Sequence, residues 1–200
     1  MMILRSSPPS PFGRKVKIAA ALVGLTEKIE VVMADTTDPT DVLRSQNPLG
    51  KIPILILEDG TTLFDSRVIV EYLDWLGGGD ILIPAEPQAR FAALTQAALA
   101  DGILDAAILQ IQEERFRSPE RREAKWTNYQ AEKVVRALAA CDARPPTGRR
   151  DVAHIGLACA LGYLDLRFAG KWRDSYKSLV TWLDAFEAEV PAFAATRFVA

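Results

Sequence analysis

The stretch Asn47-Pro48-Leu49-Gly50-Lys51-Ile52-Pro53 contains the pattern that decides the fold of this chain. An apolar run over residues 52–57 is followed by Glu58-Asp59-Gly60 and by a second run over 61–64. Two such runs on either side of a turn that carries Asp-Gly predict a β-hairpin. A proline is tolerated in a sheet only at a strand start or at an edge. Pro53 therefore marks a strand start or an edge strand, and a loop that feeds an edge strand is the interpretation that needs no function.

The residues before this stretch predict a strand, a helix and a second strand. Residues 2–5 are short and apolar, and they run into a loop rich in serine and proline that ends at Pro11. From Phe12 the apolar residues recur every three or four positions, which predicts a helix, and Gly24 ends it. The second strand is expected at residues 29–33. Strand–helix–strand units favour parallel pairing.

The residues after this stretch begin with a helix from Ser66 that ends at Gly77-Gly78-Gly79. The first part of the chain thus reads β-α-β, an irregular loop with one short helix near 41–45, then β-β-α. Residues 80–87 have the composition of a linker. Everything beyond is expected to be helical. The expected helices span residues 88–117, 120–143, 151–168 and 175–190.

Composition indicates an ordinary globular protein. Among 200 residues, 49% are hydrophobic and 25% charged, and the net charge of −2 comes with no basic or acidic tract. Neither nucleic acid nor a membrane is therefore an expected partner. The N-terminus has too short an apolar stretch for a signal peptide, so we expect a cytoplasmic protein. No Cys-x-x-Cys pair and no metal cluster are present, and Cys141 and Cys159 are expected to be small buried residues.

Three motifs occur in order. Ser10-Pro11-Phe12-Gly13-Arg14-Lys15-Val16 precedes the stretch at 47–53, and Asp65-Ser66 follows it. This pattern resembles the glutathione S-transferases, which carry Asn-Pro-x-Gly-Lys/Gln-Val/Ile-Pro with a cis proline and then Glu/Asp-Ser. The resemblance covers essentially the whole chain. It implies a mixed fold, α/β plus all-α, with a thioredoxin-like glutathione-binding domain at 1–79 and a helical-bundle domain at 88–200.

The resemblance also implies a glutathione site. A cis bond at Ile52-Pro53 would turn the Ile52 backbone outward to pair with the cysteinyl backbone of glutathione as an added strand. Ser66, at a helix start, suits the γ-glutamyl carboxylate, and Asp65 can accept from the γ-glutamyl ammonium. Lys51 is expected to meet the cysteinyl–glycine end. The alternative for Asp65 and Ser66 is a helix cap alone.

Ser10 is the expected catalytic residue. In the resembling enzymes a Ser, Tyr or Cys in this region faces the glutathione sulfur, and Ser10 matches by its register against Pro-Phe-x-Arg-Lys. Ser6 and Ser7 are rivals, and a purely structural cap at the start of the helix is the other alternative. No cysteine precedes Cys141, which favours thiolate activation and conjugation over thiol transfer.

The expected function is that of a glutathione transferase acting in detoxification: bound thiolate attacks a small, hydrophobic electrophile, with glutathione as co-substrate and no metal. Peroxide reduction, isomerisation or dehalogenation on the same scaffold is an alternative, and a non-catalytic protein-binding scaffold is another. The resemblance implies a homodimer across the third and fourth helices. Ile108, Gln112 and Trp126 are candidates for an electrophile pocket. His154 occupies the third position of the helix that follows Asp151, where the family has Asp, so a capping or packing role is expected.

Overall fold

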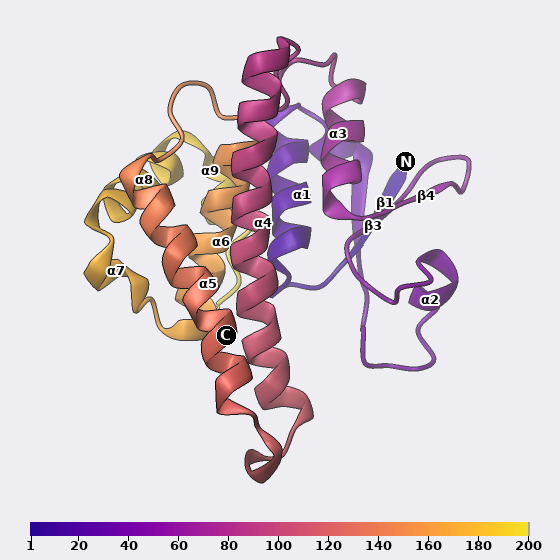
Figure 1. The fold of residues 1–200 in the computed structure, drawn as a ribbon. Helices are drawn as coiled ribbons and strands as arrows, with labels where there is room; N and C mark the ends of the chain where they lie inside the picture. Colours follow the sequence, from indigo (N-terminus) through magenta and orange to yellow (C-terminus); the bar gives the residue numbers. More distant parts are fainter. Residues whose placement is uncertain (200) are drawn as a thin grey trace. The chain divides into compact units, whose positions relative to one another are not determined.

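The computed structural model describes residues 1–199, which form two compact units (Figure 1). The first unit combines residues 1–91 with 190–198, and the second contains residues 92–189. The chain segment 190–198 thus packs with the N-terminal unit, which the sequence analysis does not anticipate. The domain boundaries at residues 79 and 88 remain a prediction.

The first unit is built on a small mixed sheet. Its strands are β1 (Met2–Ser6), β2 (Ile29–Met33), β3 (Ile54–Ile56) and β4 (Thr62–Leu63), in the order β2-β1-β3-β4. β1 and β2 pair in parallel, as expected for a strand–helix–strand unit, and the other two pairs are antiparallel. The β3–β4 turn closes through Gly60, whose φ of +86° is easily adopted by glycine. The predicted mixed sheet is confirmed.

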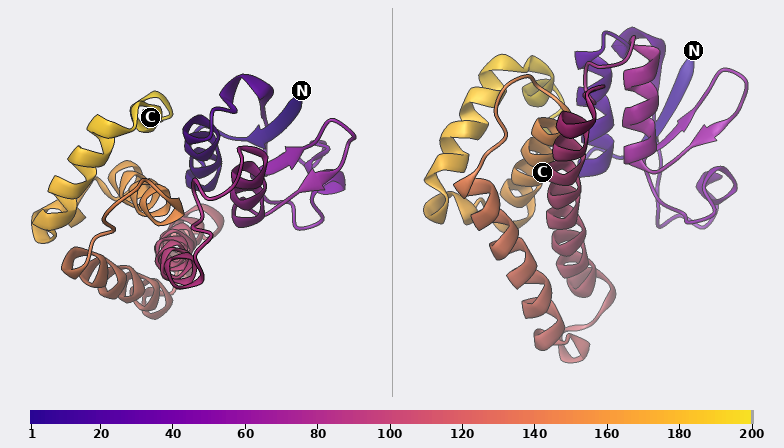
Figure 2. Two further views of the ribbon diagram at one scale, coloured as in Figure 1. Left: turned by 90° about the horizontal axis from the view of Figure 1, so that it is seen from above. Right: turned by 45° about the horizontal axis from the view of Figure 1, so that its top comes forward.

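Helices α1 and α3 pack against each other, and both lie to the same side of the sheet in the two views of Figures 1 and 2. The helical elements of this unit are α1 (Pro11–Leu22), η1 (Thr26–Lys28), α2 (Leu43–Gln46), α3 (Ser66–Leu76) and α9 (Pro191–Ala195). The packing of α1 and α3 buries the apolar faces of both helices, which form much of the core of this unit.

The short helix α9 packs against α1 through an arginine. The guanidinium of Arg14 donates to the Phe193 carbonyl at 2.5 Å and lies 3.9 Å from the centre of the Phe193 ring. Its Nε also donates to the Thr196 hydroxyl at 3.3 Å. Five residues are too few to hold a helix without such packing, because helix nucleation is unfavourable. Sequence periodicity therefore gives no signal for α9.

The second unit is helical. α4 (Pro87–Phe116) begins in the first unit, and the elements that follow are η2 (Pro119–Arg121), α5 (Ala124–Ala143), α6 (Val152–Phe168), α7 (Trp172–Ser175) and α8 (Lys177–Glu189). α6 is buried on almost every side, as expected for a helix that is apolar all round. By length and composition alone α4 is apolar enough to cross a membrane, a property that core helices share, and 44% of its most apolar window is buried.

Two expected helices have different boundaries in the structure. The helix expected from residue 120 begins at Ala124, because the Glu123 carboxylate caps it by accepting from the Lys125 N–H at 2.9 Å. The helix expected over 175–190 is divided between α7 and α8. The start of α8 is capped from α5, where the Asp142 carboxylate accepts from the Leu179 N–H at 3.1 Å. Such tertiary caps leave no mark on sequence periodicity.

Candidate functional site

The strand register brings three loops to one end of the sheet. Arg5, next to the end of β1, pairs with Ile54, the first residue of β3. Leu55 of β3 pairs with Leu63, the last residue of β4. Because both pairings are antiparallel, β1 and β4 end where β3 begins. The neighbouring loops contain residues 7–10, 51–53 and 65–66.

The loop before β3 is held by Asn47, which is 2% exposed. Its side-chain amide donates to the Lys51 carbonyl at 2.9 Å, and its side-chain oxygen accepts from the Leu49 N–H at 3.0 Å. Gly50 makes the turn at φ +61°. The Ile52–Pro53 peptide bond is cis. Asn47 was not among the predicted site residues, although its place before the proline identifies it in retrospect.

An ion pair anchors the segment that leads into this loop. The Arg5 guanidinium on β1 donates to both carboxylate oxygens of Asp41, at 2.6 and 2.9 Å. Asp41 also accepts from the backbone N–H groups of Asp35 and Leu43. The Asp35 N–H, with further help from Leu43 and Arg5, lowers the pKa of the Asp41 carboxyl below its ordinary value. Asp41 therefore remains an anion that ties α2 to β1.

Ser10 is the N-cap of α1. Its hydroxyl oxygen accepts from the Gly13 N–H at 3.1 Å, and its own O–H proton has no acceptor within residues 1–199. A hydroxyl can accept and donate at once, so capping leaves the donor available. Ser6 is 2% exposed, and its hydroxyl donates to the Ser7 carbonyl at 3.5 Å, which makes it a weaker candidate than Ser10. Ser7 is half-buried and remains a rival.

Gly13 allows the first turn of α1 to approach β1. A Cβ atom at this position would lie 2.0 Å from the Ser6 hydroxyl oxygen and 3.3 Å from that of Ser10. Any larger residue would therefore displace one of the two serines. This requirement was missed in the sequence, where Gly13 fills the variable position of the Ser-Pro-Phe-x-Arg-Lys pattern.

Asp65 and Ser66 begin α3. Asp65 is exposed and caps the helix by accepting from the Arg67 N–H at 2.9 Å. Ser66 is 3% exposed and is the first residue of the helix, where backbone N–H groups lack partners inside the helix. Asp65 thus caps α3, and its role in ligand binding stays a prediction. A helix start with a hydroxyl beside it also suits a carboxylate ligand.

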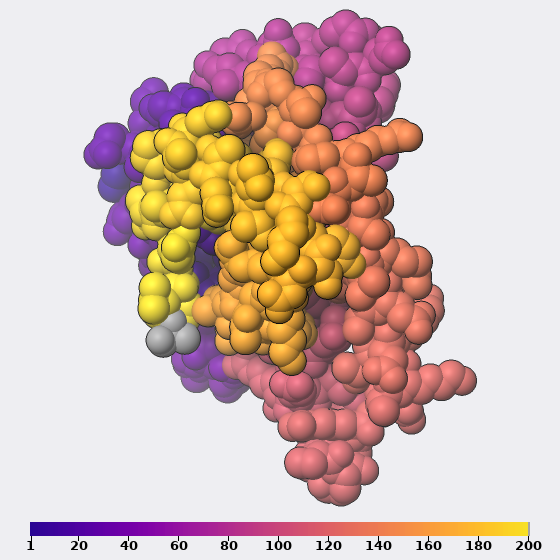
Figure 3. Space-filling view, turned by 90° about the vertical axis from the view of Figure 1, so that its left-hand side faces the viewer, coloured from indigo at the N-terminus to yellow at the C-terminus, as the bar shows by residue number. Residues whose placement is uncertain are grey.

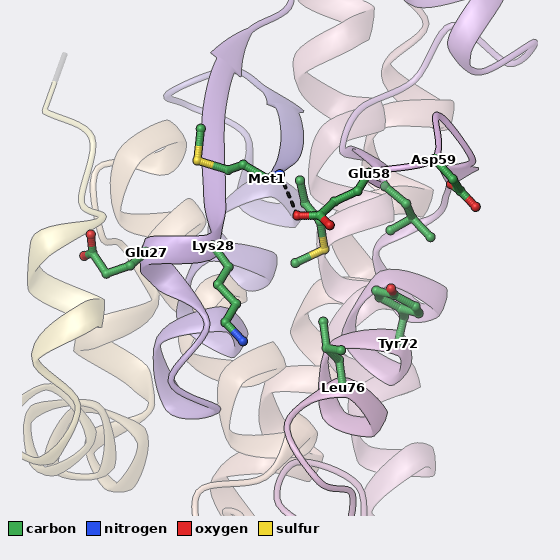
Figure 4. Close-up of a pocket in the computed structure, with 9 residues that line it drawn as sticks. Met1, Glu27, Lys28, Glu58, Asp59, Tyr72 and Leu76 are labelled. Carbon is green, nitrogen blue, oxygen red and sulfur yellow. Dashed lines mark hydrogen bonds and ion pairs between the residues drawn. The ribbon is translucent and has the colours of Figure 1, made fainter.

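A pocket of about 670 Å³ lies at the opposite end of the sheet (Figure 4). There the N-terminal ammonium of Met1 donates to Glu58 at 2.6 Å, while Tyr72 and Leu76 of α3 line the same pocket. This hydrogen bond lowers the pKa of the Glu58 carboxyl. None of the predicted site residues borders the pocket.

The remaining candidates lie elsewhere. Ile108 is half-buried, and Gln112 and Trp126 are exposed in the second unit. Both cysteines are buried, and burial raises the pKa of the Cys141 thiol to about 11. Within the described residues no three His, Cys, Asp or Glu side chains are grouped to hold a metal.

The capping and packing role expected for His154 is visible in its contacts. The Asp151 carboxylate accepts from the Ala153 and His154 N–H groups and lies 2.7 Å from the His154 Nδ1. The imidazole stacks on the Trp182 ring with 5.9 Å between centroids. The backbone N–H of Asp151 donates to the Arg149 carbonyl, so it does not need an acceptor from the side chain at position 154. His154 therefore contributes to the core of the second unit.

This sheet, with α1 and α3 against it and a helical unit following, is a thioredoxin-like domain joined to a helical domain. Residues 9–76 match the family model for the glutathione S-transferase N-terminal domain. The uncharacterized GST-like protein YibF of Escherichia coli is 32% identical over 171 residues, with 83% of each chain covered.

Solved structures agree over the full length. A glutathione transferase family member from Pseudomonas fluorescens with bound glutathione is 37% identical, with a TM-score of 0.91 and complete coverage of both chains. A glutathione S-transferase from Methylobacillus flagellatus with glutathione bound is 36% identical, with the same TM-score and coverage. The chain belongs to the glutathione S-transferase family.

Proposed function

We propose that this protein is a glutathione transferase, which binds reduced glutathione and activates its thiolate for attack on a small hydrophobic electrophile. The observation that carries the proposal is the meeting of three loops at one end of the sheet, with the free Ser10 donor among them. The glutathione-bound relatives support the ligand.

In this proposal each loop recognises one part of glutathione. The Ile52 backbone, before Pro53, pairs with the cysteinyl backbone in the manner of an added strand. Ser66 and the α3 N-terminus bind the γ-glutamyl carboxylate, and the exposed Asp65 carboxylate attracts the γ-glutamyl ammonium. Lys51 is exposed and meets the glycyl carboxylate as a counter-charge.

Ser10 donates its hydroxyl proton to the glutathione sulfur. Lowering a thiol pKa from about 8.5 by roughly two units needs about 3 kcal/mol of preferential thiolate stabilisation. A hydrogen bond to a charged acceptor contributes about 1.5 to 3 kcal/mol, and a helix N-terminus adds about 0.3 to 1. The two together reach the required size. Attack on the electrophile forms a thioether. In a substitution the leaving group departs as an anion with its bonding electron pair, and in an addition the resulting carbanion takes up a proton from water.

Calorimetry with reduced glutathione tests the binding. We expect a dissociation constant between about 1 μM and 1 mM, which corresponds to roughly 4 to 8 kcal/mol. Ser66→Ala should weaken binding by about 1 to 3 kcal/mol because it removes a charge-assisted hydrogen bond. Ser178→Ala, on an exposed position of α8, is the matched control and should bind like the wild type. The absence of both binding heat and a thermal shift at a glutathione concentration 20-fold above ~1 mM would overturn the proposal.

We further propose a cytoplasmic homodimer that acts in detoxification without nucleic acid or membrane. Exposed apolar residues on two helices support the dimer. On α3, Val68 is 47% and Trp75 is 69% exposed, and on α4 Leu99 is 37% exposed. Large exposed aromatic side chains are typical of interfaces.

A further inference from the structure

A buried hydroxyl, that of Ser6, lies beneath the first turn of α1. Ser6 is the last residue of β1 and is 2% exposed. Within residues 1–199 the only hydrogen bond of this hydroxyl is the one to the Ser7 carbonyl, at 3.5 Å. Strong O–H···O bonds are about 2.5 to 3.0 Å long, so this bond is weak. Burying a hydroxyl on so poor an acceptor costs free energy that an alanine would not, which indicates a better acceptor in another state of the protein.

The better acceptor within reach is the Ser10 oxygen. A Cβ atom at Gly13 would lie 2.0 Å from the Ser6 hydroxyl oxygen and 3.3 Å from that of Ser10. Because both oxygens are so close to one point, they are separated by no more than the sum of these distances, about 5.3 Å. Two hydrogen bonds of about 2.8 Å that meet on one water span up to about 5.6 Å. The Ser6 O–H can therefore reach the Ser10 oxygen across at most one water.

The Ser10 oxygen has room for a second donor. It accepts from the Gly13 N–H at 3.1 Å, and a hydroxyl oxygen carries two acceptor lone pairs beside its own O–H. A bond received from Ser6 would thus leave the Ser10 proton available. Hydrogen bonds in a chain polarise one another, so a hydroxyl that accepts an additional bond becomes a stronger donor. Ser6 is placed to strengthen the one donor that faces the proposed ligand.

We propose that Ser6 is a positioning residue of the thiolate site. In the glutathione complex its O–H donates to the Ser10 oxygen, across at most one water, and Ser10 donates to the sulfur. The inference rests on the proposed function, since it acts through Ser10. No proton changes place and both serines stay neutral. The pKa of the bound thiol falls because the thiolate receives a stronger hydrogen bond.

Ultraviolet titration of the thiolate in the glutathione complex tests this role. Ser6→Ala should raise the pKa of the bound thiol by about 0.3 to 1 unit. The affinity for glutathione at a pH below the thiol pKa should be unchanged, because no group that binds the peptide is altered. Ser178→Ala is the control and should leave the thiol pKa at the wild-type value. It removes a hydroxyl from an exposed position of α8, a helix on the face shown in Figure 3.

A double variant separates the Ser6 donor from its packing. In Ser6→Ala/Gly13→Ala the new methyl group at position 13 fills the space of the missing oxygen, at 3.2 Å from the Cβ of residue 6. Urea unfolding should show that this variant is at least as stable as Ser6→Ala, since alanine also favours the helix. Its bound-thiol pKa should nevertheless stay raised. A return to the wild-type thiol pKa would show that Ser6 only fills space, and would overturn the proposal.

A mutant cycle with Ser10 tests the route of the effect. Because Ser6 acts through Ser10, Ser6→Ala should raise the bound-thiol pKa no further in a Ser10→Ala background, and additive shifts would overturn the proposal. A wild-type thiol pKa in Ser6→Ala, beside a raised one in Ser10→Ala, would overturn it and leave the proposed function standing. A crystal structure of the glutathione complex should show the Ser10 oxygen bonded to the Ser6 hydroxyl or to one water that joins them. A Ser6 hydroxyl directed only at the Ser7 carbonyl in that complex would contradict the inference.

Discussion

At the scale of single residues, one hydroxyl can serve both the cap that is observed and the catalytic role that is proposed. Ser10 caps α1 with its oxygen, which leaves its proton available as a donor. The sequence alone treats capping and catalysis as alternatives, whereas the geometry makes them compatible. Ser10, Asp65 and Ser66 could be singled out from the sequence as candidates because each lies at a helix start with a motif around it. Gly13 and Asn47 were not singled out, because their structural roles are contacts with Ser6 and Lys51 that the sequence does not display.

Ser10→Ala separates the two roles. It should cost about 1 kcal/mol of stability through the lost cap. It should also raise the pKa of the bound glutathione thiol and slow conjugation at pH 7 by about 10- to 100-fold, or 1.4 to 2.7 kcal/mol, with affinity nearly unchanged. Because the loss reflects a smaller thiolate fraction, raising the pH should restore much of the rate. Ultraviolet titration of the thiolate measures the shift. An unaltered thiol pKa would move the role to Ser7.

His154→Ala should affect stability alone. It removes the contact with Asp151 and the stacking on Trp182, for a loss of about 2 to 3 kcal/mol in urea unfolding. The thiol pKa of bound glutathione should stay at the wild-type value in the folded variant. A folded His154→Ala protein with a raised thiol pKa would show that the imidazole acts on the thiol after all.

At the scale of elements, strands and long helices follow from periodicity, but short elements do not. β2 occupies residues 29–33 as predicted, and α6 begins directly after the predicted cap Asp151. α9 and the break before α8 depend on Arg14 and Asp142, which are distant in sequence. The information that sets those boundaries is tertiary, so a local pattern cannot contain it.

The contact of α6 with α4 depends on Gly156. A Cβ atom there would lie 3.2 Å from the Ala100 Cβ, whereas at Gly102 of α4 it would meet nothing within 4 Å. Gly102→Ala should therefore raise the free energy of unfolding by about 0.5 to 1 kcal/mol through helix propensity. Gly156→Leu should lower it by about 1 to 3 kcal/mol through overpacking. Urea unfolding of both variants measures the difference, and equal stabilities would contradict the close packing.

At the scale of the whole molecule, the exposed apolar side chains of α3 require a covering surface. Trp75 is 69% exposed, and a second copy of the chain is the proposed cover. Sedimentation should give a species of twice the 22.0 kDa chain mass at micromolar concentration. Trp75→Arg should shift it toward monomer, because a central aromatic residue at an interface contributes about 2 kcal/mol or more per protomer.

Val31→Arg supplies the control for this last prediction. Val31 is 52% exposed on β2, at an edge of the sheet and outside the two helices proposed for the interface. Val31→Arg introduces the same positive charge as Trp75→Arg, so general repulsion between copies would weaken dimerisation equally in both variants. We expect only Trp75→Arg to dissociate. A wild-type monomer, or a dimer that Val31→Arg disrupts and Trp75→Arg leaves intact, would place the association surface away from α3.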